Sequence, residues 1–378
     1  MHSNYCAFTK LIFSPIKLFA EFRNSLRGTR SGAIGLDQTQ PLQFLMSIGP
    51  LEDLMNRIRA FQESRALLTA VELDLFSALG QGATAAETAS RMQSDGRATE
   101  MLMNAMVALE MLQKKDGVFR NTQLAAQYFT EGSTDNVRLA MMHTAYLWDR
   151  WSTLTESVRT GASQQRASVG ERDQHWTEAF IAAMDRNVAE RAPFVINAVD
   201  TSGVRRMLDV GGGSGGYAIA FAKASPALHA DVLDLPAVLP LTEQYIEKSG
   251  LTERVKTRAG DFQRDEFGRD YDLVFVSAIC HMLGPAENQD LFRECFAALA
   301  FGGRIVVQDF ILQPDKTAPR QAALFALNWL VVTRNGGNYS EVEYSTWLGN
   351  AGFQDVRHVL LPGSTGLMVG AKNGFPAA

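Results

Sequence analysis

The stretch Met207-Leu208-Asp209-Val210-Gly211-Gly212-Gly213-Ser214-Gly215-Gly216 decides the fold of this chain. It begins as a short apolar run with one acid and ends as a glycine-rich turn, and the segment 217–223 that follows predicts a helix. A strand, a glycine turn and a helix start together form a nucleotide-binding unit, because glycine lets the backbone approach a ligand and the helix N-terminus presents free N–H groups. We therefore expect a ligand with a nucleoside part at this turn.

The glycine spacing fits two kinds of ligand. Gly211, Gly213 and Gly216 satisfy G-x-G-x-x-G, the dinucleotide pattern. Gly211, Gly213 and Gly215, preceded by Asp209, satisfy D-x-G-x-G-x-G, the form seen in methyltransferases that use S-adenosylmethionine. A nicotinamide-dependent oxidoreductase and a methyltransferase are both open on this evidence, and the rest of the chain has to discriminate between them.

The length and the composition of the chain are those of an ordinary globular protein. The chain has 378 residues, enough for two domains, and its net charge of −5 gives no basic field that favours nucleic acid. Cys6, Cys280 and Cys295 have neither disulfide-framework nor metal-site spacing, so we expect a reducing cytoplasmic location and no metal. No apolar run approaches about 18 residues, so we expect no stable membrane insertion.

The first 40 residues predict a separate N-terminal arm. Five basic residues and one acid alternate with apolar side chains before position 36. Three interpretations fit this pattern: an amphipathic presequence or membrane-surface helix, an arm that packs on a partner subunit, and an over-long gene start.

Residues 41–175 predict a helical domain with a winged-helix arrangement. Thr84-Ala85-Ala86-Glu87 is a capping box that begins a helix, and Lys114-Lys115-Asp116-Gly117 predicts a hairpin turn. Between residues 82 and 120 five basic residues are balanced by five acids, which argues against a DNA-binding regulator. The methionine and leucine content instead favours a dimer interface, so we expect a homodimer.

Residues 176–378 predict an α/β catalytic domain. Strands and helices alternate after the glycine turn, and the last two strands have only a short link, which makes them an antiparallel pair. The predicted strands are 230–233, 255–257, 272–276, 303–308, 356–361 and 366–371. A parallel sheet finished by an antiparallel hairpin is the architecture of class I methyltransferases.

Polar side chains follow the predicted strands where a ligand crevice should open. Asp234 ends the second strand, where a carboxylate can accept both ribose hydroxyls of an adenosine. Asp261 follows the third strand and can accept from the adenine amino group, and Phe262 can cover the ring. His281 follows the fourth strand as a candidate catalytic base, and Asp309 at the end of the fifth can orient its ring.

The second half of the chain resembles the plant-type O-methyltransferase family, which includes caffeate-type and acetylserotonin-type enzymes and bacterial relatives. The stretches LDVGGGSGG, VLDLP, AGDF, SAICH and FGGRIVVQDFIL carry the likeness. The resemblance implies an S-adenosylmethionine site, a helical dimerisation domain ahead of the catalytic domain, and His281 as general base. The residues that we assign to the cofactor are Asp209, Gly211, Gly213, Asp234, Leu235, Asp261, Phe262 and Ser277.

The chain departs from the family pattern around the base. Met282-Leu283 stand where the plant members usually have Asp-Trp, and Asp309 stands where they usually have Glu. The second acid that would orient the histidine falls at Asn338, whose amide can bond to an imidazole but cannot stabilise its charge. We keep Asn338 as the third catalytic candidate.

The function that we predict is a homodimeric, S-adenosylmethionine-dependent O-methyltransferase of a small aromatic or conjugated hydroxyl compound. Met184 and Trp148, in an aromatic-rich helical segment ahead of the glycine turn, are the candidate acceptor contacts. Two alternatives are a nicotinamide-dependent oxidoreductase and a cofactor-binding relative that does not transfer a methyl group. No pattern in the sequence identifies the acceptor.

Overall fold

The computed structural model describes residues 49–164 and 174–373. Its described residues from Arg59 onward form one compact unit, and helix α2 (Pro50–Arg59) is described by itself. The predicted arm, 1–40, lies outside the described residues. In the two described ranges, no helix combines the length and the apolar content that a membrane crossing requires.

The first part of this unit is helical. Its core is formed by buried apolar side chains that include Phe76, Met103, Met106 and Phe119. The elements are α3 (Phe61–Glu72), α4 (Leu75–Leu79), α5 (Ala85–Met92), α6 (Gly96–Ala108), β1 (Leu112–Lys115), β2 (Val118–Asn121), α7 (Gln123–Phe129), α8 (Arg138–Trp151) and α9 (Leu154–Thr160).

The order of α4, α5, α6 and a hairpin is the one that the winged-helix interpretation expects. Thr84 caps α5 through the predicted box, because its hydroxyl accepts from the Glu87 amide while the Glu87 carboxylate accepts from the Thr84 amide. The hairpin turns at Asp116 and Gly117, both with positive φ, as a tight turn between twisted strands requires. An antiparallel bridge between Ala83 and Phe119 ties the hairpin back to the start of α5.

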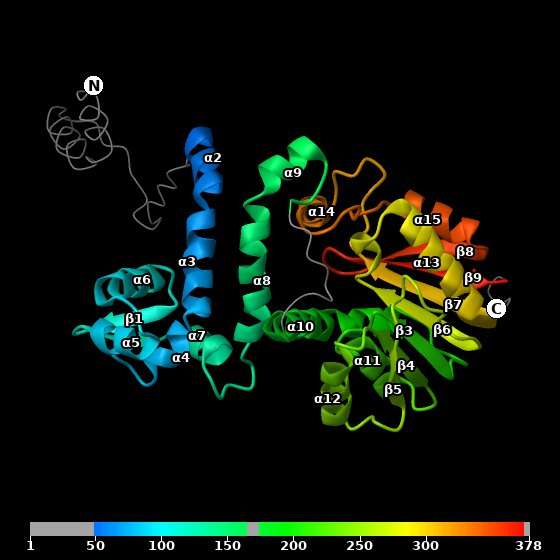
Figure 1. Ribbon diagram of the computed structural model, residues 1–378, viewed down its shortest axis with the longest axis horizontal. Helices are drawn as coiled ribbons and strands as arrows, with labels where there is room; N and C mark the ends of the chain where they lie inside the picture. The colour runs from blue at the N-terminus through cyan, green and yellow to red at the C-terminus, as the bar shows by residue number, and fades with distance from the viewer. Residues whose placement is uncertain (1–48, 165–173, 374–378) are drawn as a thin grey trace, which may run out of the picture. The chain divides into compact units, whose positions relative to one another are not determined.

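Helix α10 (Gln174–Ala198) joins the helical part to the sheet. It packs against α8 on one side and α11 on the other, so it crosses the boundary predicted at 175/176 as one continuous element (Figure 1). The domain boundary itself stays a prediction.

The sheet has the order β5-β4-β3-β6-β7-β9-β8, parallel except for the pairs β7–β9 and β9–β8. The class I methyltransferase architecture and the antiparallel end are confirmed. The strands are β3 (Arg206–Val210), β4 (His229–Asp234), β5 (Val255–Ala259), β6 (Tyr271–Ser277), β7 (Leu299–Asp309), β8 (Phe353–Leu360) and β9 (Gly366–Lys372). The helices are α11 (Gly216–Ala224), α12 (Leu239–Ser249), α13 (Pro285–Ala298), α14 (Arg320–Val332) and α15 (Glu341–Asn350), with a short 3₁₀ turn, η2 (Cys280–Met282).

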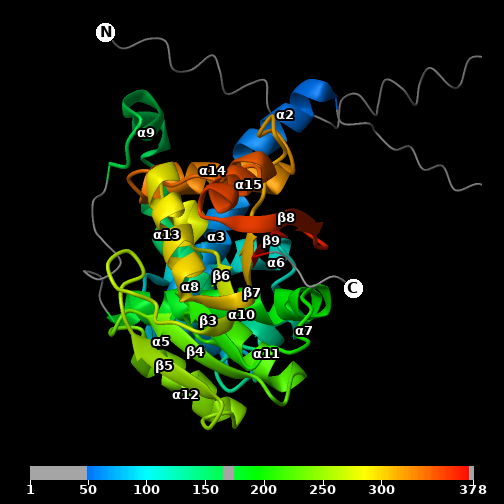
Figure 2. The same cartoon turned by 90° about the vertical axis from the view of Figure 1, so that its right-hand side faces the viewer.

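Both faces of the sheet are covered, because alternate residues of each buried strand belong to different cores. On β6, Leu273 and Phe275 pack with α10 and α11, whereas Val274 and Val276 pack with α13 and α15. Figures 1 and 2 show α11 and α12 on one side of the sheet and α13 and α15 on the other.

The chain order of the strands reverses direction at β3 and β6, which are neighbours. A ligand crevice opens beyond the carboxyl ends of strands at such a reversal. The glycine turn follows β3 and the His281 turn follows β6, so the two sequence motifs meet at this edge.

Candidate active site

The glycine turn depends on positive φ angles and on close packing at Gly211. Gly211, Gly213 and Gly215 have positive φ, and a Cβ built on Gly211 would lie 2.5 Å from Ile279 Cδ1 and 3.7 Å from Phe262 Cδ1. The turn therefore faces the segments that follow β5 and β6, and its bare backbone suits the close approach of an adenosine.

Asp234 is anchored by two backbone amides. Gly213 N donates to its Oδ2 at 2.8 Å and Leu235 N donates to its Oδ1 at 2.7 Å. Burial raises the pKa of the Asp234 carboxyl, and these two N–H groups act against that increase. Each carboxylate oxygen keeps a free lone pair, so the half-buried group can still accept from a ribose hydroxyl.

Asp209 lies beneath the turn rather than in the crevice. Its side chain is buried, Ala218 N donates to Oδ2 at 3.3 Å, and Oδ1 has no hydrogen-bond partner in the described part of the chain. Burial raises the pKa of Asp209 to about 7, and the charge of Asp234 adds to the increase. This places Asp209 behind the cofactor turn, and its predicted role as a direct contact stays a prediction.

The two adenine candidates lie on one tight turn after β5. The Asp261 carboxylate accepts from Gln263 N at 3.0 Å and pairs with Arg264 at 3.5 Å, while Phe262 lies near the glycine turn. Asp261 remains half-buried and its oxygens can accept another donor. These positions fit the predicted adenine contacts, which stay a prediction.

The segment after β6 is held by β7. The Ser277 hydroxyl donates to Gln308 Oε1 at 2.7 Å, and Ala278 N donates to the Gln308 carbonyl at 3.0 Å. Ala278 has φ of 57°, a left-handed conformation that is costly for a residue with a Cβ. This backbone conformation leads the chain from β6 into η2, which carries His281.

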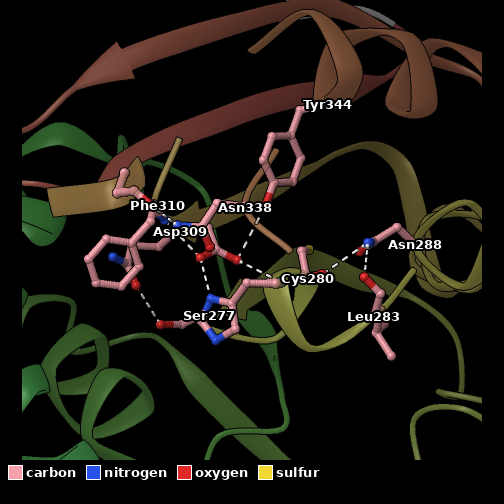
Figure 3. A network of polar contacts seen from close by, with 11 residues as sticks. Ser277, Cys280, Leu283, Asn288, Asp309, Phe310, Asn338 and Tyr344 are labelled. Carbon is pink, nitrogen blue, oxygen red and sulfur yellow. Dashed lines mark hydrogen bonds and ion pairs between the residues drawn. The ribbon is translucent and has the colours of Figure 1, made fainter. Parts of the chain in front are cut away.

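His281 and Asp309 form a buried pair. His281 Nδ1 lies 2.5 Å from Asp309 Oδ1, and the two residues are 3 % and 1 % exposed. Asp309 Oδ2 accepts from the Tyr344 hydroxyl at 3.2 Å and from the His281 amide at 3.3 Å; Figure 3 shows Tyr344 pointing toward Asp309. With Nδ1 donating to the carboxylate, Nε2 is the nitrogen that can accept a proton.

Aromatic rings surround the imidazole. Trp329 stacks on it at 4.0 Å between centroids, Phe325 meets it edge-on at 5.6 Å, and Phe310 lies at 6.3 Å. We call Phe310, Phe325 and Trp329 the aromatic cage. Two of the three lie on α14, a helix that the sequence patterns above do not predict.

The loop before α15 packs against the backbone of the turn that carries His281. A Cβ on Gly336 would lie 2.5 Å from the His281 carbonyl oxygen, and Gly337 N donates to the same oxygen at 3.0 Å. Asn338, predicted to orient the imidazole, instead donates from Nδ2 to the Ala322 carbonyl at 2.6 Å. No hydrogen bond joins Asn338 to His281, and the predicted catalytic role of Asn338 stays a prediction.

Two family comparisons cover most of the described chain. Residues 151–354 match the O-methyltransferase domain, and residues 55–131 match the O-methyltransferase dimerisation domain. The chain belongs to the O-methyltransferase family. The S-adenosylmethionine cofactor, the N-terminal dimerisation domain and the enzyme class are confirmed, and the nicotinamide alternative is wrong.

The similar proteins span nearly the whole methyltransferase. The 3-hydroxy-5-methyl-1-naphthoate 3-O-methyltransferase of Streptomyces sahachiroi is 36% identical over 82% of this chain and 92% of its own length. The tetracenomycin polyketide synthesis 8-O-methyl transferase TcmO of Streptomyces glaucescens is 30% identical over 85% and 96%. The solved structure of PigF with SAH superimposes with a TM-score of 0.78 at 27% identity, over 85% of this chain and 99% of PigF.

The two acceptor candidates of this methyltransferase lie on different helices. Met184 is on α10, one turn after Ile181, which lies 3.6 Å from the Cβ position of Gly213. Trp148 is on α8, but the Arg65 guanidinium carbon lies over its ring, 5.5 Å from the ring centre. Another α8 residue, Trp151, contacts the cage helix: its indole N–H donates to Asn328 Oδ1 at 3.1 Å.

Proposed function

We propose that His281, oriented by Asp309, removes the proton from the hydroxyl of a flat aromatic acceptor as this methyltransferase moves a methyl group to that oxygen. One observation carries the proposal: the 2.5 Å contact of His281 Nδ1 with Asp309 Oδ1 inside the aromatic cage. The pair leaves Nε2 as the free proton acceptor, and the cage provides flat apolar surface beside it.

The chemistry needs alignment and a base. When bound, S-adenosylmethionine supplies the methyl group, which leaves the sulfonium as the new O–CH₃ bond forms. The glycine turn and Asp234 would hold the nucleoside part of the cofactor, and this would align its methyl group with the acceptor oxygen. A phenol has a pKa of about 10, so a base that takes its proton helps at neutral pH. The Asp309 carboxylate then stabilises the imidazolium that forms.

The acceptor class follows from the cage. His281 is only 3 % exposed, and Phe325 and Trp329 lie against its ring, so an acceptor placed beside Nε2 makes the most contact with those rings if it is flat. The relatives named above act on a naphthoate and in tetracenomycin polyketide synthesis, both consistent with fused aromatic rings. We infer a hydroxylated fused-ring acceptor, with Met184 as a contact.

We further infer a homodimer in the cytoplasm. The dimerisation match lies on α2 to α7, where Met101 and Leu124 are 60 % and 53 % exposed in the single chain. Both cysteines in the described residues are free and buried, which suits a reducing compartment. Light scattering at micromolar concentration tests assembly; a monomer would contradict it.

The proposed function is tested by methyl transfer to a matched series of acceptors. A hydroxynaphthalene, the corresponding methoxynaphthalene and an aminonaphthalene are incubated with the protein and S-adenosylmethionine carrying a labelled methyl group. We expect label on the hydroxynaphthalene only. Label on the amine alone, or cofactor binding without transfer to any of a wide panel of hydroxylated aromatic compounds, would overturn the proposal.

A further inference from the structure

A cationic side chain borders the aromatic cage. Arg191 lies half-buried on α10, and its guanidinium carbon is 5.4 Å from the centre of the Phe310 ring. We propose that Arg191 binds a carboxylate of the acceptor, which makes the substrate a hydroxyaryl carboxylic acid. This inference rests on the proposed function, because it specifies the acceptor of the same site.

Arg191 has no acidic partner within the described ranges. The acid beside it on the helix, Glu190, pairs with Arg186 at 3.2 Å. No carboxylate of the described residues lies within 4.0 Å of the Arg191 guanidinium, and its one ring contact is with Phe310. A partly buried cation without a counter-charge is costly, so a partner anion supplied by a ligand would stabilise it.

The position of Arg191 favours the acceptor as the source of that anion. Phe310 is a common neighbour of Arg191 and His281, and it also packs on Phe325 at 4.3 Å. A ring that presents its hydroxyl to His281 lies within this cage, so a carboxylate on the same ring comes close to Arg191. Guanidinium is the preferred group for such a contact, because it donates two parallel hydrogen bonds to a carboxylate and stacks on an aromatic face.

The cofactor is the other possible source of a carboxylate. Arg191 also interacts electrostatically with Tyr217, at the start of α11. Burial raises the pKa of the Tyr217 hydroxyl to about 12, and the positive charge of Arg191 opposes that increase. Arg191 thus lies within electrostatic reach of the helix that follows the glycine turn. The methionine carboxylate of the cofactor has the same chemistry, so the experiment separates the two.

The experiment compares a hydroxynaphthoic acid with the naphthol that lacks the carboxylate. Methylation kinetics are measured for the wild type, Arg191→Met and Arg191→Lys, and binding of S-adenosylhomocysteine is measured by calorimetry. Arg186→Met is the matched control, since it removes an exposed, ion-paired arginine of the same helix. We expect Arg191→Met to raise KM for the acid about 10–100-fold, the size of a lost charge-assisted pair, with the naphthol unchanged. Arg191→Lys should give a smaller increase.

Two results would overturn this inference. Equal losses on both acceptors together with weaker S-adenosylhomocysteine binding would assign Arg191 to the cofactor carboxylate. Unchanged kinetics on both acceptors, with the wild type methylating acid and naphthol equally well, would remove Arg191 from recognition while leaving the proposed function intact. Failure of the wild type to methylate any hydroxylated aromatic would instead refute the proposed function.

Discussion

The glycine turn and the aromatic cage meet at one edge of the sheet but are built in different ways. The glycine turn uses backbone: its contacts come from main-chain N–H groups and from the absence of Cβ atoms over one strand–turn–helix segment. The aromatic cage uses side chains from separate elements, with His281 on η2, Asp309 at the end of β7 and Trp329 on α14. A short motif describes the first kind of site, and only packing assembles the second.

Replacing His281 should separate the two regions most clearly, because it should lower turnover strongly and leave cofactor binding nearly unchanged. We expect His281→Gln to lower turnover by about 10²–10⁴, the usual contribution of a general base, with S-adenosylhomocysteine affinity within a few fold of the wild type. His358→Gln is the matched control, because His358 is also bonded to a carboxylate, Glu341 at 2.7 Å, but lies on β8 outside the site. Retained turnover in His281→Gln would show that alignment alone drives transfer.

The buried acid behind the glycine turn should give a pH-dependent stability. Because burial holds the pKa of Asp209 at about 7, the native protein keeps a proton that the unfolded chain releases near pH 4. The free energy of unfolding should therefore fall with rising pH across this window, by at most about 1.4 kcal/mol per unit, and Asp209→Asn should lack this decline.

Urea unfolding from pH 4.5 to 8 measures this effect as a growing stability difference between Asp209→Asn and wild type. Asp200→Asn is the control: hydrogen bonds from Ser202 hold the pKa of Asp200 below its ordinary value, so it titrates below the range. A pH-independent difference for Asp209→Asn would contradict the prediction.

Glycine replacements separate turn conformation from close approach. Gly211 and Gly203 both have positive φ, 64° and 75°, but only Gly211 has an atom within 3.0 Å of the Cβ position. We expect Gly203→Ala to cost about 1 kcal/mol of unfolding free energy and Gly211→Ala about 1–3 kcal/mol. Only Gly211→Ala should weaken S-adenosylhomocysteine binding; equal effects would show that the turn does not contact the cofactor.

The smallest effect is expected at Asn338. Because its Nδ2 donates to Ala322 O and no hydrogen bond joins it to His281, Asn338→Ala should cost about 1 kcal/mol of unfolding free energy and less than about ten-fold in turnover. Chemical denaturation and steady-state kinetics measure the two. A turnover loss as large as that of His281→Gln, with stability unchanged, would restore Asn338 as an orienting residue.

The strands around the glycine turn, the helix cap and the hairpin turn could be predicted from sequence patterns because their interactions are local in the chain. Strands β4 to β6 lie within one or two residues of their predicted ranges, and the Thr84 cap and the Asp116–Gly117 turn depend on neighbours only a few positions away. Backbone propensity, glycine spacing and alternation of buried residues act over such short distances.

The cage depended on tertiary packing because its contacts with the His281–Asp309 pair join residues far apart in sequence. Tyr344 and Asp309 form a hydrogen bond although 35 residues separate them in the sequence, and 48 residues separate His281 from Trp329. Trp329 lies on a helix whose apolar sequence pattern does not differ from that of an ordinary core helix. No sequence motif surrounds Arg191, and its proposed role follows only from its contact with Phe310, more than a hundred residues later in the chain. The patterns thus predicted the fold and the cofactor, and they named His281 as the candidate base, a role that stays a prediction. Only the packing of α10 and α14 against the sheet placed the aromatic rings and the arginine around His281.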